Sequence, residues 1–161
     1  MKIHPLIITL FFMAVLTSQD NFTTIYLIRH AEKADTTPDT HLSESGKERA
    51  IRWMEYLVNN RIDAIYTTPY HRTRETARPL ADALKMKVTE YGPREMDLIT
   101  LAKKHHNQSV VVVGHSNTIP GYINKALGES RYTDIPEEEF GQIYIVQISN
   151  DKVVNVQVET L

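Results

Sequence analysis

Short apolar runs alternate along this chain with segments whose apolar residues recur at helical spacing. The runs are rich in branched and aromatic side chains, which favour strands. The valine run at 110–113 is continuously apolar, which is typical of a central strand buried on both faces of a sheet. The last two runs flank a polar Ser149-Asn150-Asp151-Lys152 turn and predict a β-hairpin. The predicted strands cover residues 23–28, 62–67, 86–89, 110–113, 142–148 and 153–158.

Between these strands, the spacing of apolar residues predicts amphipathic helices. Ser43 or Ser45 can cap the first helix, and Pro69 suits the opening turn of the second. Gly92-Pro93 breaks the chain before a third helix, expected to begin near Arg94. The helices are expected at about 45–58, 69–84, 94–105 and 118–127. This alternation predicts an α/β fold: a three-layer sandwich with a mostly parallel central sheet, helices on both faces and a C-terminal β-hairpin.

The first 18 residues have a different pattern from the rest. Residues 5–16 are almost wholly apolar, follow a weakly basic start and precede the small Thr17-Ser18 pair. This stretch is shorter than the roughly 20 residues that span a bilayer, so it predicts a secretory signal peptide. Leu16 fits a cleavage site poorly, which leaves an uncleaved membrane anchor or an ordinary first strand as alternatives. We expect residues 19–161 to form one domain that is exported to the periplasm or secreted.

Composition narrows the choice of function. The chain has no cysteine, which excludes a disulfide framework, a thiol nucleophile and a cysteine metal site. Eighteen basic against 20 acidic side chains give a net charge of −2, so no basic excess points to nucleic acid or to an anionic membrane surface. Positive charge that serves function must therefore be concentrated in a cleft. The oligomeric state has no signature in the sequence.

Polar residues follow three of the predicted strands at the points where those strands end. Arg29-His30 follows the first run, Gly114-His115 follows the valine run, and Arg72 lies in the opening turn of the second helix. In a right-handed parallel sheet these transitions share one edge, where the helix N-termini add partial positive charge. An Arg-His pair alone is usually incidental. Together with Arg72 and His115 at the same edge, it predicts a cleft in which guanidinium groups bind phosphate oxygens and an imidazole is a possible nucleophile.

Four segments carry a family resemblance in addition to these spacings. They are Leu27-Ile28-Arg29-His30-Ala31-Glu32-Lys33, Leu42-Ser43-Glu44-Ser45-Gly46, Thr68-Pro69-Tyr70-His71-Arg72-Thr73-Arg74-Glu75-Thr76-Ala77 and Val112-Val113-Gly114-His115-Ser116-Asn117-Thr118. In these segments and their order the chain resembles the small phosphatase branch of the histidine phosphatase superfamily, which has the phosphoglycerate-mutase-like fold. The resemblance spans nearly the whole predicted domain.

The resemblance implies a phosphoric monoester hydrolase of the histidine acid phosphatase type, which needs no metal or cofactor. His30 would attack phosphorus and carry a phosphohistidine that water hydrolyses. Arg29 and Arg72 would hold the non-bridging oxygens of a small phosphorylated substrate, and His115 would donate to them. Ser116 and Asn117 would complete the phosphate site.

The general acid is the least determined residue. Larger relatives carry a glutamate after the third strand that protonates the leaving group, but residues 90–97 here do not single out one carboxylate. Glu95 is our choice, at the expected start of the third helix, where it would equally serve the helix dipole. An enzyme without an acid would favour good leaving groups, such as those of acyl phosphates or phosphohistidine.

Other functions stay open. A non-catalytic phosphate-binding module would need the same cleft, and a phosphoglycerate-type mutase would need a capping insertion for which the chain has little room. A zinc hydrolase of His30, His71 and His115 lacks local ligand spacing. A serine esterase lacks the second glycine of its nucleophile elbow, since that position is Thr118.

Several individual roles also have two interpretations. Arg72 could be one of three arginines on a solvated helix face, with Arg74 and Arg78 pairing to Glu75 and Asp82. Glu32 and Lys33 either shape the substrate site or form salt bridges. Residues 35–41 and 129–140 are expected at the mouth of the cleft.

Overall fold

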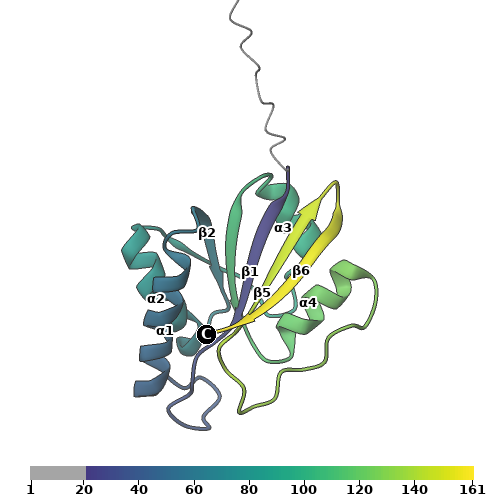
Figure 1. The fold of residues 1–161 in the computed structure, drawn as a ribbon. Helices are drawn as coiled ribbons and strands as arrows, with labels where there is room; N and C mark the ends of the chain where they lie inside the picture. The colour runs from purple at the N-terminus through teal and green to yellow at the C-terminus, as the bar shows by residue number, and fades with distance from the viewer. Residues whose placement is uncertain (1–20) are drawn as a thin grey trace, which may run out of the picture.

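A computed structural model gives the fold, and it describes residues 21–161 (Figure 1). The predicted leader, residues 1–18, lies outside the described residues. Within 21–161 no helix has the length and apolar character needed to cross a bilayer. The elements, in chain order, are β1 (Thr23–Arg29), α1 (Glu44–Leu57), β2 (Ile62–Thr67), α2 (His71–Leu84), β3 (Val88–Glu90), α3 (Leu98–Lys104), β4 (Ser109–Gly114), α4 (Thr118–Leu127), β5 (Gln142–Ser149) and β6 (Lys152–Thr160).

One six-stranded sheet forms the middle layer, in the order β3-β2-β4-β1-β5-β6. β1 and β2 both pair in parallel with β4, and β3 pairs in parallel with β2. β5 runs antiparallel to β1 and forms an antiparallel hairpin with β6. The predicted α/β sandwich with a mostly parallel sheet and a C-terminal hairpin is confirmed. Val110, Val111, Val112 and Val113 are all buried, as a central strand requires.

Helices cover both faces of this sheet (Figure 1). Alternate strand residues point to opposite sides, so Ile25 and Leu27 pack with α3 and α4, whereas Ile28 packs with α1 and α2. Trp53 and Leu57 of α1 are fully buried in the second of these cores. The two cores clamp β1 and β4 between them, which holds the ends of these strands in fixed positions.

Three elements start two or more residues later than predicted, each because of a local cap or turn. α3 begins at Leu98 rather than near Arg94, because residues 93–95 form a turn and the Asp97 side chain caps the helix by accepting from the amide of Thr100 at 2.8 Å. α2 begins at His71, after the extended Tyr70. β3 starts two residues late, because the amide of Met86 still donates to the last turn of α2.

The start of α1 is fixed against the segment that follows β1. Ser43 caps the helix by accepting from the amide of Gly46 at 3.1 Å, as predicted. A Cβ at Gly46 would collide with the carbonyl oxygen of Glu32. This close approach requires glycine, and it packs α1 directly on the residues beside His30.

Candidate active site

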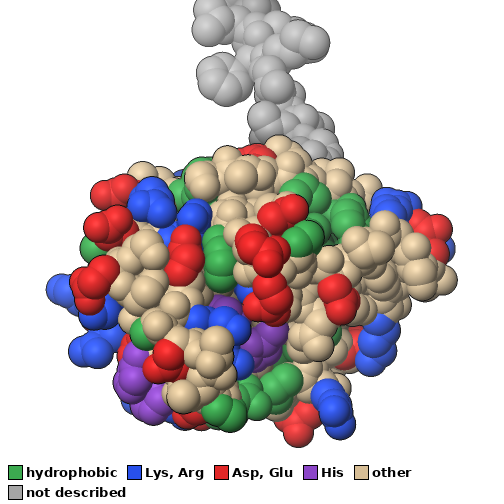
Figure 2. Space-filling model, turned by 90° about the horizontal axis from the view of Figure 1, so that it is seen from below, with side chains coloured by type: hydrophobic (Ala, Val, Ile, Leu, Met, Phe, Trp, Pro, Cys, Tyr) green, Lys and Arg blue, Asp and Glu red, His purple; other side chains and the backbone are tan. Residues whose placement is uncertain are grey.

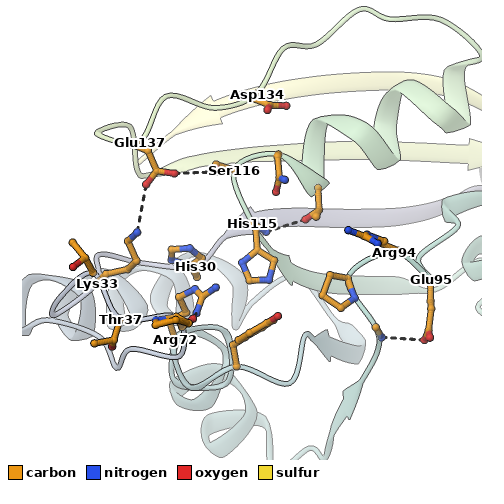
Figure 3. A pocket seen from close by; sticks show the side chains of 17 residues that line it. His30, Lys33, Thr37, Arg72, Arg94, Glu95, His115, Ser116, Asp134 and Glu137 are labelled. Atoms are coloured by element: carbon orange, nitrogen blue, oxygen red, sulfur yellow. Dashed lines mark hydrogen bonds and ion pairs between the residues drawn. The ribbon is translucent and has the colours of Figure 1, made fainter.

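A cavity of about 890 Å³ opens at the edge of the sheet where β1, β2 and β4 end. Figure 2 looks onto this face, where blue and purple side chains lie in a hollow with red side chains around it. Figure 3 shows the lining from close by. His30, Arg72 and His115 meet there, as the strand-end argument predicted. The complete lining is His30, Lys33, Thr36, Thr37, Pro38, Tyr70, Arg72, Gly92, Pro93, Arg94, Glu95, His115, Ser116, Asn117, Thr118, Asp134 and Glu137.

His30 lies at the end of β1 with only 4% of its surface exposed. Its Nδ1 is 2.8 Å from the carbonyl oxygen of Ala31, a contact that fits an Nδ1–H donor and leaves the Nε2 lone pair free. Its pKa is lowered to about 3, mainly by burial. The contact with the Ala31 carbonyl raises the pKa, whereas the nearby His115, Arg72 and Arg29 lower it further. The imidazole is therefore neutral at neutral pH, the form that a nucleophile needs.

His115 faces His30 with ring centroids 5.5 Å apart and ring planes at 66°. Its pKa is lowered to about 4, first by burial and then by Arg72 and Arg29. Its Nε2 lies 2.9 Å from the hydroxyl of Thr68, which donates to the hydroxyl of Thr73 at 3.0 Å. Thr73 in turn donates to a backbone carbonyl, either Thr68 O at 2.8 Å or Tyr70 O at 2.9 Å. This chain leaves Thr68 as the acceptor of an Nε2–H, which fixes the tautomer of neutral His115.

Arg72 stands in the first turn of α2 and lines the cavity. Its Nη1 donates to the carbonyl of Pro38 at 2.8 Å, and its guanidinium carbon lies 4.5 Å from the centroid of the Tyr70 ring. The Tyr70 ring also meets His115 edge-on at 5.3 Å. Loop 35–41 thus forms one wall of the cavity, as expected, and holds Arg72 in place.

The neighbouring arginines of α2 have other partners. Arg74 pairs with Glu90 at 2.6 Å and not with Glu75 as the alternative proposed, whereas the expected pair of Arg78 with Asp82 is present at 3.6 Å. Glu75 binds the loop instead, through His41. Of these three arginines only Arg72 lines the cavity, so the solvated-face interpretation is wrong for it.

Arg29 lies behind the cavity wall and does not line it. Only 4% of its surface is exposed, and burial lowers its pKa. Its Nη1 donates to the carbonyls of Pro136 and Glu139, both at 2.8 Å, and its guanidinium carbon lies 4.2 Å from the centroid of the Phe140 ring. Among residues 21–161 its buried Nε–H has no acceptor. The guanidinium therefore anchors loop 129–140 in this arrangement.

Glu137 connects Arg29 to the cavity. Its carboxylate accepts from Nη2 of Arg29 at 3.2 Å. It also lies 3.5 Å from Nζ of Lys33 and accepts from the hydroxyl of Ser116 at 3.5 Å, the two contacts that Figure 3 draws. The side chain of Glu137 is 64% exposed, so it can leave this position at little cost in packing. Of the two interpretations of Glu32 and Lys33, Glu32 fits the salt bridge, with Arg49 at 2.7 Å, whereas Lys33 fits both, because it lines the cavity and pairs with Glu137.

Glu95 lines the cavity from the turn at 93–95, not from a helix start. Its Oε2 accepts from the amide of Gly92 at 3.1 Å, so the predicted interaction with a helix dipole is absent (Figure 3). Ser116 and Asn117 also line the cavity, where the resemblance places them. Asp134 and Glu137 are the other carboxylates of the lining.

Sequence reasoning missed several residues of this site. Thr68, Tyr70 and Thr76 belong to the motif around Arg72. The resemblance extends over all ten residues of that motif, and this could have marked them as part of the site. Thr76 accepts from the amide of Ala31 at 2.9 Å and donates to the carbonyl of Arg72 at 2.7 Å, so it joins the two motifs. Glu137 had no signal, because its role depends on how loop 129–140 returns to Arg29. His71 lies outside the lining, so the zinc set of His30, His71 and His115 is not assembled.

The family model described as "Histidine phosphatase superfamily (branch 1)" matches residues 25–99. No curated protein matches the chain. Many solved structures share its fold, among them the following three. YhfR of Bacillus stearothermophilus is 19% identical, with a TM-score of 0.69 over 85% of this chain and 96% of its own. A mutant phosphoserine phosphatase from Entamoeba histolytica in complex with phosphoserine is 18% identical, with a TM-score of 0.67 over 83% and 96%. The protein histidine phosphatase SixA complexed with tungstate is 16% identical, with a TM-score of 0.67 over 85% and 96%.

The match covers the strand that leads into Arg29-His30, the first two helices and the turn that holds Glu95. The match does not reach His115 after β4 or the other lining residues beyond residue 99, which this structure places at the same sheet edge. The family match over residues 25–99, the shared fold and these motifs all agree with the resemblance to the histidine phosphatase superfamily.

Proposed function

We propose that the protein is a phosphatase that hydrolyses small phosphate monoesters through a phosphohistidine on His30. The observation that carries the proposal is a neutral buried imidazole, tied by Nδ1 to a backbone carbonyl, beside Arg72 and His115 in one cavity. Solved structures of the same fold hold phosphoserine in one case and tungstate, a phosphate-like oxyanion, in another. These ligands belong to those proteins and support a phosphorylated substrate here.

The chemistry follows from the geometry. The Nε2 lone pair of His30 forms a bond to phosphorus while the bond from phosphorus to the leaving oxygen breaks. Water then attacks phosphorus, the P–N bond breaks, and its electron pair returns to Nε2 as phosphate leaves. Arg72 lines the cavity with His30, where its fixed cation would face the equatorial oxygens and stabilise the charge that spreads over them in a loose transition state.

His115 gains its role when the substrate binds. Its neutral form has one proton, which the hydrogen bond to Thr68 fixes on Nε2. Two arginines and burial keep its pKa low in the empty cavity. A bound phosphate dianion reverses the sign of the local field, so it favours a second proton on Nδ1. The resulting imidazolium can donate to a phosphate oxygen while Thr68 holds the opposite side of the ring.

The Glu137 carboxylate lies where a phosphate group of the substrate could bind. It contacts Arg29, Lys33 and Ser116, which are two cations and a hydroxyl at the edge of the cavity. Because it is exposed, a substrate phosphate can displace it and take over these partners. Arg29 would then bind phosphate through the Nη2 that Glu137 releases, as the family resemblance implies.

Glu95 is the proposed acid, because it lines the cavity on a turn beside Gly92. The substitution Glu95→Gln should slow aliphatic phosphates, whose leaving groups need a proton, far more than p-nitrophenyl phosphate. Equal slowing of both would remove Glu95 from this role. The enzyme would then fit the second candidate function, a phosphatase for acyl phosphates or phosphohistidine.

The decisive experiment traps the intermediate. The wild-type protein and His30→Ala are incubated with p-nitrophenyl phosphate, and with a radiolabelled monoester that is quenched in alkali. We expect turnover and an acid-labile, alkali-stable phosphoryl group on the wild type, and neither on His30→Ala. Turnover that survives in His30→Ala contradicts the nucleophile. Tight vanadate binding without turnover would instead favour a phosphate-binding module.

A further inference from the structure

A second cluster of histidine side chains lies at the rim of the same face, apart from the cavity (Figure 2). It consists of His41 from the loop after β1 and His71 and Glu75 from the first turns of α2. One ligand atom from each of these residues lies within 4.8 Å of the other two. We propose that this cluster binds a divalent transition-metal ion, of which Zn²⁺ is the best match.

The cluster has the spacing of a metal site built on a helix. His71 and Glu75 are four residues apart in α2 and therefore share one helix face. The loop brings His41 to that face, with its Nδ1 2.5 Å from Oε1 of Glu75. The rings of His41 and His71 stack with centroids 4.2 Å apart and planes at 26°. Two imidazoles and a carboxylate are a donor set that suits Zn²⁺ and leaves a fourth position for water.

Charge favours a dication at this place. Asp39 lies beside the cluster, with one oxygen 3.8 Å from Nε2 of His71 and the other accepting the backbone amide of His71 at 2.8 Å. Asp39 and Glu75 place two carboxylates beside the two rings, and a divalent ion can offset their charge while it bonds to both imidazoles. A carboxylate beside a ligating histidine also orients the ring and raises metal affinity.

Neighbouring cations do not compete for this position, because they have other partners. Arg74 pairs with Glu90, Arg78 with Asp82, and Lys47 with Glu44. Arg72 donates to Pro38 and lies over the ring of Tyr70.

Metal binding requires the ligand atoms of His41, His71 and Glu75 to move by about an ångström, since ligand atoms around Zn²⁺ lie near 2.0–2.2 Å from the ion. The exposed side chains of His41 and His71 have the freedom to make these movements.

The position of the cluster connects it to the cavity. His41 closes the base of loop 35–41, where the amide of Ala34 donates to the carbonyl of His41 at 2.9 Å. The same loop lines the cavity with Thr36, Thr37 and Pro38 and accepts from Arg72. A metal that joins His41 to α2 on both sides of Arg72 would clamp this wall. The effect on catalysis rests on the proposed function, whereas the metal site itself does not.

Calorimetric titration of the full chain, purified without a tag and treated with chelator, tests the site with Zn²⁺. We expect one equivalent to bind tightly to the wild type and its affinity to fall by about tenfold or more in His41→Ala and in His71→Ala. His106→Ala removes another exposed histidine and is the matched control. Equal affinity in all four proteins, or weak binding of the wild type in the millimolar range, overturns the proposal. Thermal unfolding without metal verifies that every variant is folded.

Hydrogen exchange distinguishes a clamp from a passive ion. Amides of residues 34–42 should exchange more slowly with Zn²⁺ than without it in the wild type, and equally in His71→Ala. Unchanged exchange in the wild type contradicts the clamp. Neither measurement uses turnover, so an inactive protein that binds Zn²⁺ would refute the proposed function and leave the metal site standing. An active protein that binds no Zn²⁺ would refute the metal site and leave the proposed function standing.

Discussion

Acidification should destabilise this protein through His30, and His30→Asn should remove that sensitivity. The asparagine amide can donate to the Ala31 carbonyl as Nδ1 does, but it does not titrate. The pKa of His30 is about 3 in the folded protein, against 6.5 for an unperturbed histidine. Between these two values the unfolded chain binds a proton that the folded protein does not. The free energy of unfolding therefore rises with pH across this window and falls as pH is lowered through it.

The size of the effect follows from the two pKa values. Lowering the pH from 7 to 4.5 should cost about 2.5 kcal/mol of folding free energy at His30, because each unit of pKa difference corresponds to about 1.4 kcal/mol. His115 should cost a comparable amount, since its pKa falls to about 4 for the same physical reasons. The sum is a large part of the roughly 5–15 kcal/mol that stabilises a typical domain.

Urea unfolding of the wild type and of His30→Asn at a series of pH values between 7 and 4.5 measures this difference. The wild type should lose about 2.5 kcal/mol more than the variant over this range. His106→Asn, an exposed histidine at the opposite end of β4, is the control and should keep the wild-type slope. Parallel slopes for the wild type and His30→Asn would refute the reasoning, because they would mean that the buried imidazole titrates alike in both states.

Three further predictions concern single contacts. Thr68→Val should lower kcat about 10- to 100-fold with a smaller change in KM, as expected when a hydrogen bond to a charged group is lost. Thr68→Ser keeps the hydroxyl and should have most of the wild-type kcat. An unchanged kcat in Thr68→Val would show that Thr68 does not fix the tautomer of His115. Glu137→Gln should tighten vanadate inhibition severalfold by freeing Arg29 and Lys33, and weaker inhibition would show that Glu137 supports the anion site rather than competing for it. Gly46→Ala should lower the unfolding free energy by about 1–3 kcal/mol through the clash with Glu32, measured in urea, whereas Gly121→Ala, with no atom near its added Cβ, should not.

The sequence predicts those parts of the site that follow directly from strand ends. His30 and His115 come immediately after buried strands, and Arg72 lies in the next helix turn, so the parallel sheet alone brings them to one edge. The third helix was placed too early because Gly92-Pro93 marks a break but not the length of the turn that follows. Asp97, which caps α3, is four residues beyond that break.

Arg29 marks the limit of sequence reasoning for this site. Its place beside His30 predicted a phosphate ligand, yet its guanidinium is buried under loop 129–140 and bonded to two backbone carbonyls and Glu137. The path of that loop depends on long-range packing, which leaves no local pattern in the sequence. Phe140 covers the guanidinium, and Ile135 is buried in the core against α4, so both ends of the Glu137 turn are held. The exposed Glu137 carboxylate between them has room to move.

This arrangement gives the anion site two states with different charges. With Glu137 in place, its carboxylate offsets one of the two positive charges of Arg29 and Lys33. A phosphate dianion brings more charge than the carboxylate it replaces and can bond to Ser116 as well. A monoanion gains less from the same exchange. The cavity should therefore select doubly charged monoesters over diesters, a preference that comes from competition with the protein's own carboxylate, and Glu137→Gln should reduce it.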